Sequence, residues 1–214
     1  MNLEPLYRLR LITPRLELRL GTRDELVEVH ELARRGIHPP DEMPFENPWT
    51  DHSGDEDFVE QCIAFHESTL RDWRPDRWSF NPLVFLDGRP IGSQGMRAED
   101  FPTRREVDTG SWLGQAFQGQ GIGTEMRTAL LELAFRSLGA DAALSGSVFG
   151  NESSRRVSEK LGYAVVGTST IAPRGQPVEK YDFRLERSEW RAPFAVEIEG
   201  AEACLGLFGV SESA

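Results

Sequence analysis

The chain of 214 residues contains little cysteine and little histidine. Its two cysteines, Cys62 and Cys204, are too few for a disulfide framework or a cysteine-based zinc site. Its four histidines include no pair spaced four residues apart, so we expect no metal site. No apolar run approaches the roughly 20 residues that cross a membrane, and residues 1–20 lack the apolar core of a secretory signal. These absences predict a globular protein of the cytoplasm.

Basic residues are scarce relative to acidic ones, with 24 against 35, and the formal net charge is −11. This balance argues against non-specific nucleic-acid binding, which needs a basic surface. It permits a cationic acceptor that the field of the protein attracts. Between Pro39 and Glu60 the chain has eight acidic residues and no lysine or arginine. This stretch is either a solvated loop or a rim that attracts a cationic substrate.

The length and an apolar content of 39% fit one domain. We expect residues 1–190 to form this domain and residues 191–214 to be a C-terminal extension. The extension is more apolar than a free tail, so we expect it to pack on the domain or across a homodimer. Its large apolar side chains are Phe194, Val196, Ile198, Leu205, Leu207 and Phe208.

The order of apolar and polar residues predicts a mixed α/β domain of the α+β type. Alternation over residues 16–20 predicts a strand. Two capping boxes, Thr22 with Glu25 and Ser53 with Glu56, predict the starts of two helices. The apolar face of the second helix is expected to carry Phe58, Cys62, Phe65 and Thr69.

The rest of the chain predicts an antiparallel meander followed by an α-helical crossover. The Asp87-Gly88 pair is typical of a hairpin turn, and Asp100–Thr103 is expected to be a loop. Strands are expected at 79–86, 90–98, 106–113, 142–148, 163–171 and 178–185, and helices at 124–138 and 151–161.

The segment from Gln118 to Thr124 joins a predicted strand to a predicted helix and carries three glycines at alternate positions. Glycines let a backbone approach a ligand closely, and the free N–H groups of a helix start favour an anion. A P-loop needs a lysine after its glycines, and a dinucleotide fingerprint needs a glycine where Thr124 stands. On the glycines alone, a pyrophosphate site and an ordinary turn both remain open.

Two motifs resemble the GNAT acetyltransferases. The run Q-x-x-G-x-G from Gln118 to Gly123 resembles their acyl-CoA signature, and N-x-x-S-x-x-V-x-E-K-L-G-Y from Asn151 to Tyr163 resembles their second cofactor motif. The resemblance covers about four fifths of the chain, from residue 16 to residue 185. It points to the branch of ribosomal-protein N-terminal acetyltransferases. The stretches MPFENPWT, DFP and GSWLG are closer still to a mycobacterial member classed as a succinyltransferase.

The resemblance implies a GNAT fold in which two strands separate and the pantetheine of acyl-CoA lies in the opening. Backbone groups of Trp112 and Leu113 would bind pantetheine, and Asn151 would bind it near the thiol. Ser154 and either Arg155 or Arg156 would lie near the nucleotide. The two arginines are adjacent on a helix and point to different sides, so we expect only one of them, taken as Arg156, to reach the cofactor. The pyrophosphate would meet N–H groups of Gln118, Gly119, Gln120, Gly121, Ile122, Gly123 and Thr124.

The implied reaction is direct transfer of an acyl group from acyl-CoA to a primary amine of a small molecule or protein, in a ternary complex. Asp108 is the expected base, with Glu106 in reserve, and the Leu113 N–H is the expected oxyanion donor. Ser158 stands where many members have a tyrosine acid, so it acts through water or no side chain supplies the proton. Tyr163 is expected in the core.

The acceptor and the acyl group remain open. Acetyl is the expected acyl group and succinyl the alternative, for which His38 or Arg97 could supply a cation. His30 and His66 are expected to be ordinary helix residues. Other readings are a CoA-binding regulatory pseudoenzyme and a nucleotide-binding protein of another family. The expected acceptor residues are Phe45, Glu46, Trp49, Asp51 and Phe101 beside Asp100, although Phe45 and Trp49 could simply hold a long loop to the core.

Overall fold

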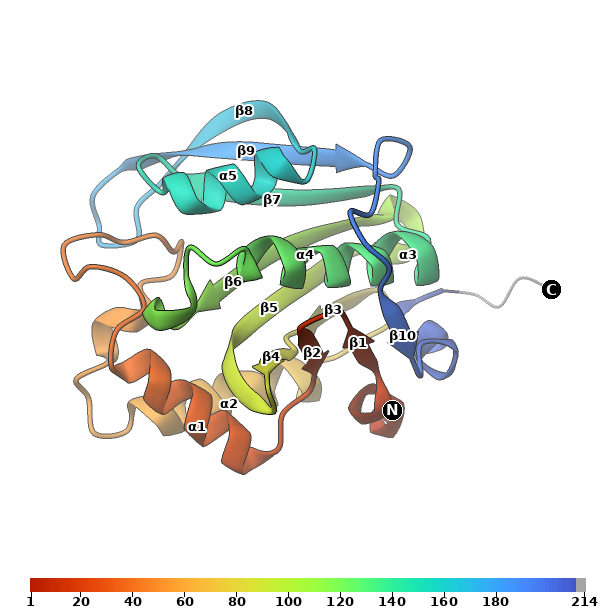
Figure 1. The fold of residues 1–214 in the computed structure, drawn as a ribbon, viewed down its shortest axis with the longest axis horizontal. Helices are drawn as coiled ribbons and strands as arrows, with labels where there is room; N and C mark the ends of the chain where they lie inside the picture. Colours follow the sequence, from red (N-terminus) through yellow and green to blue (C-terminus); the bar gives the residue numbers. More distant parts are fainter. Residues whose placement is uncertain (211–214) are drawn as a thin grey trace.

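The computed structural model describes residues 1–210, and its centre is one ten-stranded sheet (Figure 1). The strand order is β10-β1-β2-β4-β5-β6-β7-β9-β8, and β3 pairs with β5 beside this path. The strands are β1 (Arg10–Ile12), β2 (Leu16–Arg19), β3 (Arg77–Phe80), β4 (Leu83–Leu86), β5 (Arg89–Glu99), β6 (Glu106–Leu113), β7 (Ala142–Val148), β8 (Ala164–Ile171), β9 (Val178–Glu186) and β10 (Glu197–Glu199). The helices are α1 (Arg23–Arg34), α2 (Phe58–Arg71), α3 (Phe101–Arg104), α4 (Ile122–Glu132) and α5 (Glu152–Lys160).

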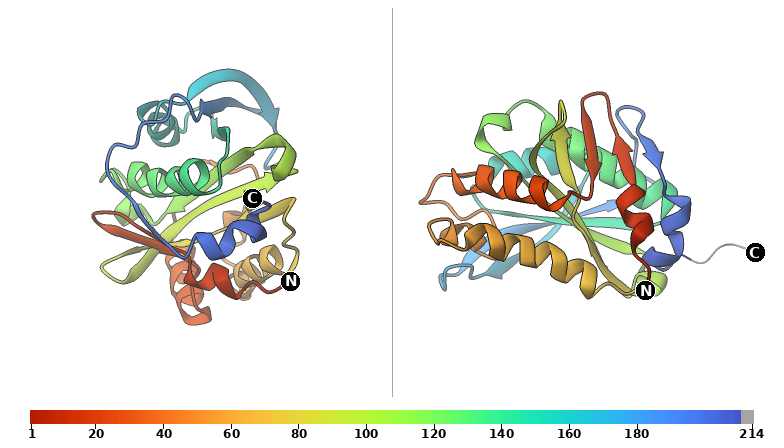
Figure 2. Two further views of the ribbon diagram at one scale, coloured as in Figure 1. Left: turned by 90° about the vertical axis from the view of Figure 1, so that its right-hand side faces the viewer. Right: turned by 90° about the horizontal axis from the view of Figure 1, so that it is seen from below.

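Helices cover both faces of the sheet because successive strand side chains point to opposite faces. On β4, Val84 joins the core beneath α4, whereas Leu83 and Phe85 pack with Val29 of α1. The helices α1 and α2 lie side by side on one face, and α4 and α5 lie on the other (Figures 1 and 2). The mixed α/β fold expected from the sequence is confirmed.

The strands β6 and β7 separate part-way along their length. They pair in parallel from Glu106 with Ala142 to Thr109 with Ser145. Beyond that point β6 continues from residue 110 to 113 along β5, while β7 continues from 146 to 148 along β9. The sheet therefore has an opening in its middle, flanked by unpaired edges of two strands.

Several expected elements are confirmed. The strands β6 and β7 have the expected bounds, and Thr22 with Glu25 forms a complete capping box. Asp87 and Gly88 both have positive φ, at 50° and 76°, as a tight hairpin turn requires.

Other expectations were wrong. The expected strand at 79–86 is two strands, because Pro82 lacks an N–H for the ladder. The capping box at Ser53 is absent, and α2 begins later, at Phe58. Phe65 is exposed rather than on a buried face. The expected loop at 100–103 is mostly the short helix α3.

The C-terminal segment packs on the same chain that precedes it. The strand β10 pairs with β1, and a 3₁₀ helix at Glu202–Phe208 lies against the N-terminal one at Glu4–Arg8 (Figure 2). The side chain of Phe208 is fully buried. The last four residues of the expected extension 191–214 lie outside the described residues. No helix in the described part is long and apolar enough to cross a membrane.

Candidate active site

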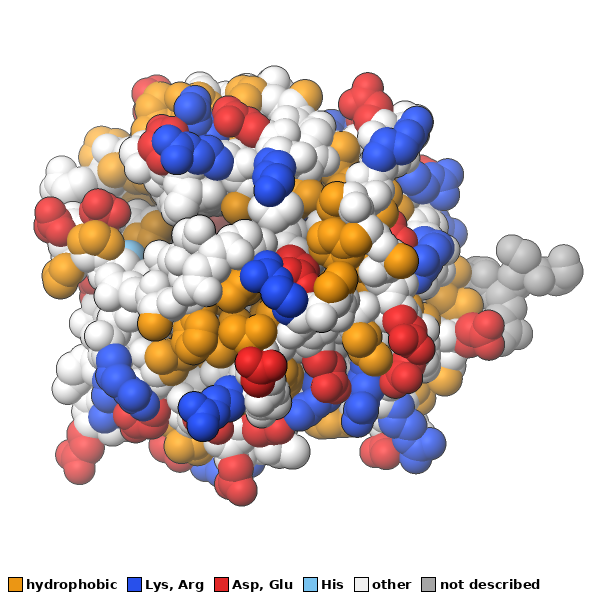
Figure 3. Space-filling model, in the orientation of Figure 1, with side chains coloured by type: hydrophobic (Ala, Val, Ile, Leu, Met, Phe, Trp, Pro, Cys, Tyr) orange, Lys and Arg blue, Asp and Glu red, His pale blue; other side chains and the backbone are white. Residues whose placement is uncertain are grey.

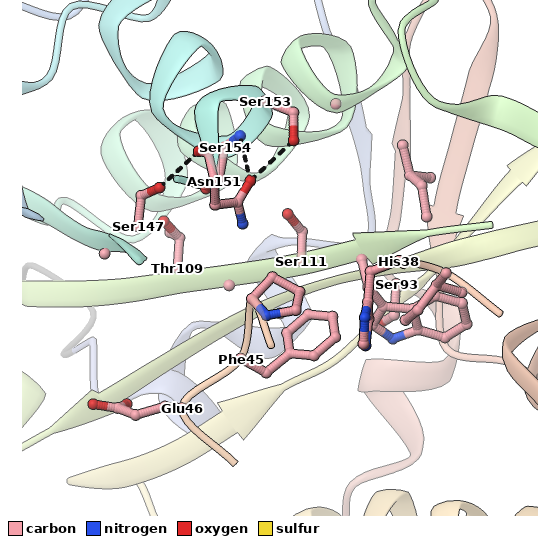
Figure 4. Close-up of a pocket in the computed structure, with 18 of the residues that line it drawn as sticks. His38, Phe45, Glu46, Ser93, Thr109, Ser111, Ser147, Asn151, Ser153 and Ser154 are labelled. Atoms are coloured by element: carbon pink, nitrogen blue, oxygen red, sulfur yellow. Dashed lines mark hydrogen bonds between the residues drawn. The ribbon is translucent and has the colours of Figure 1, made fainter. Parts of the chain in front are cut away.

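A cleft of about 1150 Å³ occupies the opening between β6 and β7 and reaches both faces of the sheet. Figure 4 shows Ser147, Asn151 and Ser154 on one side of β6, and His38 and Phe45 on the other. The first group belongs to β7 and α5, and the second belongs to the loop between α1 and α2. Two ligands can therefore approach from opposite faces and meet in the opening.

The backbone of β6 presents Leu113 to this opening. The N–H of Gly114 donates to the carbonyl of Ile91, so these two residues form a hydrogen-bonded pair of the ladder. Hydrogen-bonded and non-hydrogen-bonded pairs alternate along an antiparallel ladder, so the next pair, Leu113 with Gly92, is non-hydrogen-bonded. The two residues of a non-hydrogen-bonded pair direct their own N–H and C=O groups away from each other. The N–H of Leu113 therefore points to the opening, whereas the backbone of Trp112 faces β5. The expected backbone role of Trp112 toward pantetheine is thus wrong, and its side chain lines the cleft instead.

A glycine turn forms one wall of the cleft at the start of α4. Gly119 and Gly121 have positive φ, at 73° and 79°, which favours glycine. No side chain caps the first N–H groups of α4. Gly123 and Thr124 also line the cleft, whereas the Ile122 side chain is buried in the core. Free N–H groups and the helix dipole make this turn suitable for a phosphate.

The two glutamines of the turn have structural contacts. Gln118 donates through Nε2 to the carbonyls of Leu113 and Ile37, at 2.8 Å each, and so fixes the end of β6. Gln120 is exposed and donates to the carbonyl of Ala116. Any contact of Gln120 with a ligand would therefore come from its backbone.

The position of this helix start depends on a carboxylate that the sequence did not indicate. Glu125 is buried, and its Oε1 accepts hydrogen bonds from the Thr13 hydroxyl at 2.7 Å and the Arg15 N–H at 3.0 Å. The guanidinium of Arg15 pairs with Oε2 and also donates to the carbonyl of Gln120. The turn between β1 and β2 therefore holds the glycine turn in place.

The start of α5 supplies polar groups from the opposite wall. Asn151 caps this helix by accepting from the Ser154 N–H at 3.1 Å and from the Ser153 hydroxyl at 3.0 Å. Its amide nitrogen points toward β6 (Figure 4). Ser154 and Arg156 line the cleft, whereas Arg155 forms ion pairs with two glutamates of its own helix.

Ser158 lies outside the cleft. It is fully buried, accepts a hydrogen bond from Arg127 at 2.9 Å and donates to the carbonyl of Ser154 at 3.3 Å. The structure therefore does not support Ser158 as an acid. Tyr163 is also buried, with its hydroxyl 3.4 Å from that of Thr109, and burial raises its pKa.

Aromatic rings and two histidines line the cleft on the α1–α2 face. The ring of Trp49 lies 5.6 Å from those of Phe45 and Trp112. His30 lies 5.9 Å from Trp112 and 5.3 Å from His66, between centroids. Burial lowers the pKa of His30 to about 3 and that of His66 to about 4, so both are neutral at pH 7.

Sequence reasoning missed the two histidines as cleft residues. The signal that could have found them is the position of His30 on the apolar face of α1, four residues after Leu26 and beside the buried Val29. A polar ring on such a face requires a partner or a cavity.

Two carboxylates of β6 differ in their surroundings. Asp108 lines the cleft, and its Oδ2 accepts bonds from Arg97 at 2.6 and 3.0 Å. Glu106 pairs with Arg184 and Arg104, which lower its pKa, and it does not line the cleft. The structure therefore removes Glu106 as the reserve base.

Ion pairs attach the loop between α1 and α2 to the hairpin formed by β8 and β9. Asp51 pairs with Arg174 at 2.6 Å, and Glu46 pairs with Lys180 at 3.3 Å. The hydrogen bonds from Arg174 lower the pKa of Asp51. Glu46 lines the cleft, whereas Asp51 does not, so Asp51 holds the loop rather than facing a ligand.

Phe101 does not reach the cleft. It is fully buried, with its ring 5.4 Å from that of Trp78 and beneath the guanidinium of Arg105. Its expected acceptor role is wrong, because the segment folds as α3 and turns this side chain into the core.

The surface charges do not form a basic patch on the face shown in Figure 3, where acidic and basic side chains are interspersed. Among residues 1–210, no group of three or more side chains could hold a metal ion.

Comparison with known proteins gives the family. A family model described as acetyltransferase (GNAT) domain matches residues 15–164, which is more than half of the chain. The chain belongs to the GNAT acetyltransferase family. It is 26% identical over 132 residues to "Putative ribosomal N-acetyltransferase YdaF" of Bacillus subtilis, covering 59% of this chain and 72% of that protein.

Solved GNAT structures share the fold. RimJ of Mycobacterium smegmatis, in complex with a CoA disulfide, has a TM-score of 0.65 at 15% identity, and the match covers 93% of this chain and 92% of RimJ. The microcin C7 self-immunity acetyltransferase MccE, in complex with acetyl-CoA and AMP, has a TM-score of 0.68 at 16% identity over 81% of this chain and 93% of MccE.

The GNAT acyltransferase reaction matches this architecture. An acyl group passes from acyl-CoA to an amine, so the site must bind a pyrophosphate, an extended pantetheine arm and an amine acceptor. The glycine turn, the opening between β6 and β7, and the aromatic side of the cleft provide three adjoining regions of these kinds. The described residues therefore fit acyl-CoA.

Proposed function

We propose that this GNAT acyltransferase acylates a primary amine carried by an apolar group, and that the N-terminus of a ribosomal protein is the first acceptor to test. The observation that carries this proposal is the aromatic pocket of Phe45, Trp49 and Trp112 on the face opposite the glycine turn. Aromatic rings bind apolar groups and attract ammonium ions. The choice of a ribosomal protein rests on the name of the relative YdaF.

On the donor side, we assign the pyrophosphate to N–H groups of residues 119–124 and pantetheine to the opening between the strands. The thioester supplies an acyl carbon that an amine can attack directly. The Leu113 N–H points to the opening and can stabilise the oxygen that gains charge. Asn151, which caps α5, and Arg156 of α5 line the cleft and would contact the same ligand.

On the acceptor side, we assign the proton acceptor to Asp108. Both bonds from Arg97 go to Oδ2, which leaves Oδ1 able to accept a proton from the attacking amine. The neutral rings of His30 and His66 line the acceptor pocket without adding positive charge, which favours entry of a cationic amine. Glu46 also lines the cleft, where its ion pair with Lys180 partly offsets its charge.

Ligand-dependent thermal unfolding tests the donor part of this proposal. Acetyl-CoA and CoA should raise the unfolding midpoint, and ATP and NAD should not. A ligand at 100 times its Kd adds about 2.7 kcal/mol to the free energy of unfolding. Stabilisation by NAD or ATP without stabilisation by CoA would contradict an acyl-CoA site.

A matched pair of glycine variants locates the binding. Gly123 lies on the cleft, and an added methyl group would lie 3.4 Å from Val157. Gly54 has open space around its Cα hydrogens. Gly123→Ala should weaken CoA binding, and Gly54→Ala should leave it unchanged.

Thiol release with amines tests the acceptor part. The CoA thiol should be released faster from the donor when the acceptor is a peptide with an apolar first residue than when it is a polyamine or free lysine. If the protein binds CoA tightly but releases no CoA thiol with any amine, this result would instead support the second candidate, a CoA-binding regulatory protein. The burial of Ser158, which leaves no side-chain acid at that position, favours this candidate.

We also propose a cytoplasmic location and a homodimer. Cys62 and Cys204 are free thiols, as in a reducing compartment. The edge strand β8 exposes Val165 and Val166, an apolar area that a second copy could cover. Light scattering after size exclusion tests the dimer, and a mass of 24.1 kDa would contradict it.

A further inference from the structure

Arg127 of α4 is a buried cation without a carboxylate partner among residues 1–210. Its Nη1 donates to the hydroxyl of Ser158 at 2.9 Å and to that of Ser145 at 3.4 Å. Its Nη2 lies 3.5 Å from the hydroxyl of Ser111, and its Nε has no partner in the described part of the chain. The side chain is 3% exposed. A full positive charge is therefore surrounded by neutral hydroxyl groups.

Burying the charged guanidinium of Arg127 costs free energy unless a negative charge from another molecule compensates it. Burying an ion is strongly unfavourable when no opposite charge compensates it. The same helix follows this rule at two other positions, where Glu125 pairs with Arg15 and Glu132 pairs with Arg136. Burial lowers the pKa of Arg127, because removal from water disfavours the charged form.

The position of Arg127 shows where that anion must come from. It lines the cleft beside Ser111, which belongs to the part of β6 that has left β7, and near Ser145, in the last pair before the strands separate. Asp108 acts on Arg127 only from a longer distance and already accepts two bonds from Arg97. The compensating anion must therefore belong to the ligand in the opening.

Most of the donor cannot supply this charge. Pantetheine is uncharged, and the pyrophosphate is assigned to the glycine turn. With the pyrophosphate at the start of α4 and pantetheine along β6, the acyl group would lie nearest the end where β6 and β7 pair, so a permanent negative charge there would have to be on the acyl group itself.

We propose, on the basis of the function proposed above, that Arg127 binds the free carboxylate of a dicarboxylic acyl group. The donor is then a short half-thioester of the malonyl, succinyl or glutaryl type. A guanidinium offers donors in a planar fork that matches a carboxylate, and the Ser111 hydroxyl adds a third donor.

The transfer step balances with this donor. The amine nitrogen bonds to the thioester carbon and the C–S bond breaks. The base takes the proton of the amine, and the departing sulfur takes a proton from solvent. The distal carboxylate remains ionised and unchanged.

The two cations that the sequence suggested for such a carboxylate are already engaged. His38 has Nδ1 2.8 Å from the carbonyl of Pro39 and Nε2 2.8 Å from the hydroxyl of Thr50. Arg97 donates to Asp108. Arg127 is on the cleft and lacks an anion, so it suits this role better than either.

Calorimetric titration of the wild-type protein with succinyl-CoA and butyryl-CoA tests the inference, because the two donors have equal chain length and only one has a carboxylate. Succinyl-CoA should bind at least about tenfold more tightly, as expected for hydrogen bonds to a charged group. Equal Kd values would overturn the inference and leave the proposed function standing. Failure of every CoA species to bind would overturn the proposed function instead.

Variants locate the effect. Arg127→Gln should abolish the preference for succinyl-CoA over butyryl-CoA, whereas Arg155→Gln, off the cleft, should keep this preference. If Arg127→Gln lowers kcat equally with every donor, the charge of Arg127 acts on the departing sulfur rather than on a distal carboxylate, and the inference is overturned. If Arg127→Gln does not fold, Ser111→Ala should reduce the preference for succinyl-CoA over butyryl-CoA severalfold. An unchanged preference in Ser111→Ala would count against the inference.

Discussion

His30 and His66 are residues whose chemistry the tertiary structure changes. Each belongs to an amphipathic helix, and their rings meet at 5.3 Å beside Trp112. Burial disfavours the charged imidazolium, so the pKa values fall to about 3 and about 4. Two neutral rings therefore form part of a pocket that we assign to an amine.

These pKa values make folding stability depend on pH. Below the unfolded value of about 6.5, the unfolded chain binds protons that the folded chain does not, so the free energy of unfolding decreases as the pH falls toward 4. His30→Leu should reduce this decrease between pH 7.5 and 4.5 by on the order of 2 kcal/mol, measured by urea unfolding. Val27→Ala, at an exposed position of the same helix that carries no titratable group, is the control and should keep the wild-type slope. A wild-type slope in His30→Leu would contradict the prediction.

At the scale of elements, the loop between α1 and α2 is held over the cleft by contacts with a distant hairpin. Asp51 and Glu46 face Arg174 and Lys180, which come from the far end of the sequence (Figure 1). The acidic stretch at 39–60 is thus partly neutralised rather than a uniform attractive rim. Exposed ion pairs of this kind are screened by salt.

Arg174→Ala should loosen this loop. We expect faster limited proteolysis within residues 38–57 and a severalfold higher KM for the acceptor at low salt. The difference from wild type should shrink at 1 M salt, where the screening length is about 3 Å. Arg71→Ala removes an exposed ion pair away from the cleft and should change neither measurement. Unchanged proteolysis of Arg174→Ala at low salt would refute the role of the ion pair.

At the scale of the whole molecule, the C-terminal segment completes the core. The indole N–H groups of Trp73 and Trp78 donate to the carbonyls of Leu207 and Phe208, at 2.8 and 3.2 Å. The ring of Phe208 lies 4.8 Å from that of Trp78. The division into 1–190 and 191–214 remains a prediction, but the described part of the extension shares the core of the preceding chain.

Phe208→Ala should lower the free energy of unfolding by about 3–5 kcal/mol, because it opens a cavity among packed aromatic rings. Urea unfolding measures this change, and Glu202→Ala on the exposed side of the same helix is the control.

Deletion of residues 192–214 should expose the surface around Trp73 and Trp78 and promote aggregation. A truncated protein that remains monodisperse and as stable as the full chain would refute the packing role.

The sequence by itself determined the local features that short-range chemistry decides. Strand alternation, the Thr22–Glu25 capping box, the Asp87-Gly88 turn and the glycine turn depend on a few neighbouring residues, and the structure has them. The two motifs indicated the GNAT family for the same reason, because a glycine turn and an asparagine cap are each patterns of a few neighbouring residues.

Only the tertiary structure decided which side chains meet in the opening. The pairing of β6 with β5 directs the Leu113 N–H, and not the backbone of Trp112, toward it. Burial removed Phe101 and Ser158 from the cleft, and packing of α4 against β6 and β7 placed Arg127 there without an anion. These outcomes depend on contacts between residues far apart in the chain, which no local pattern encodes.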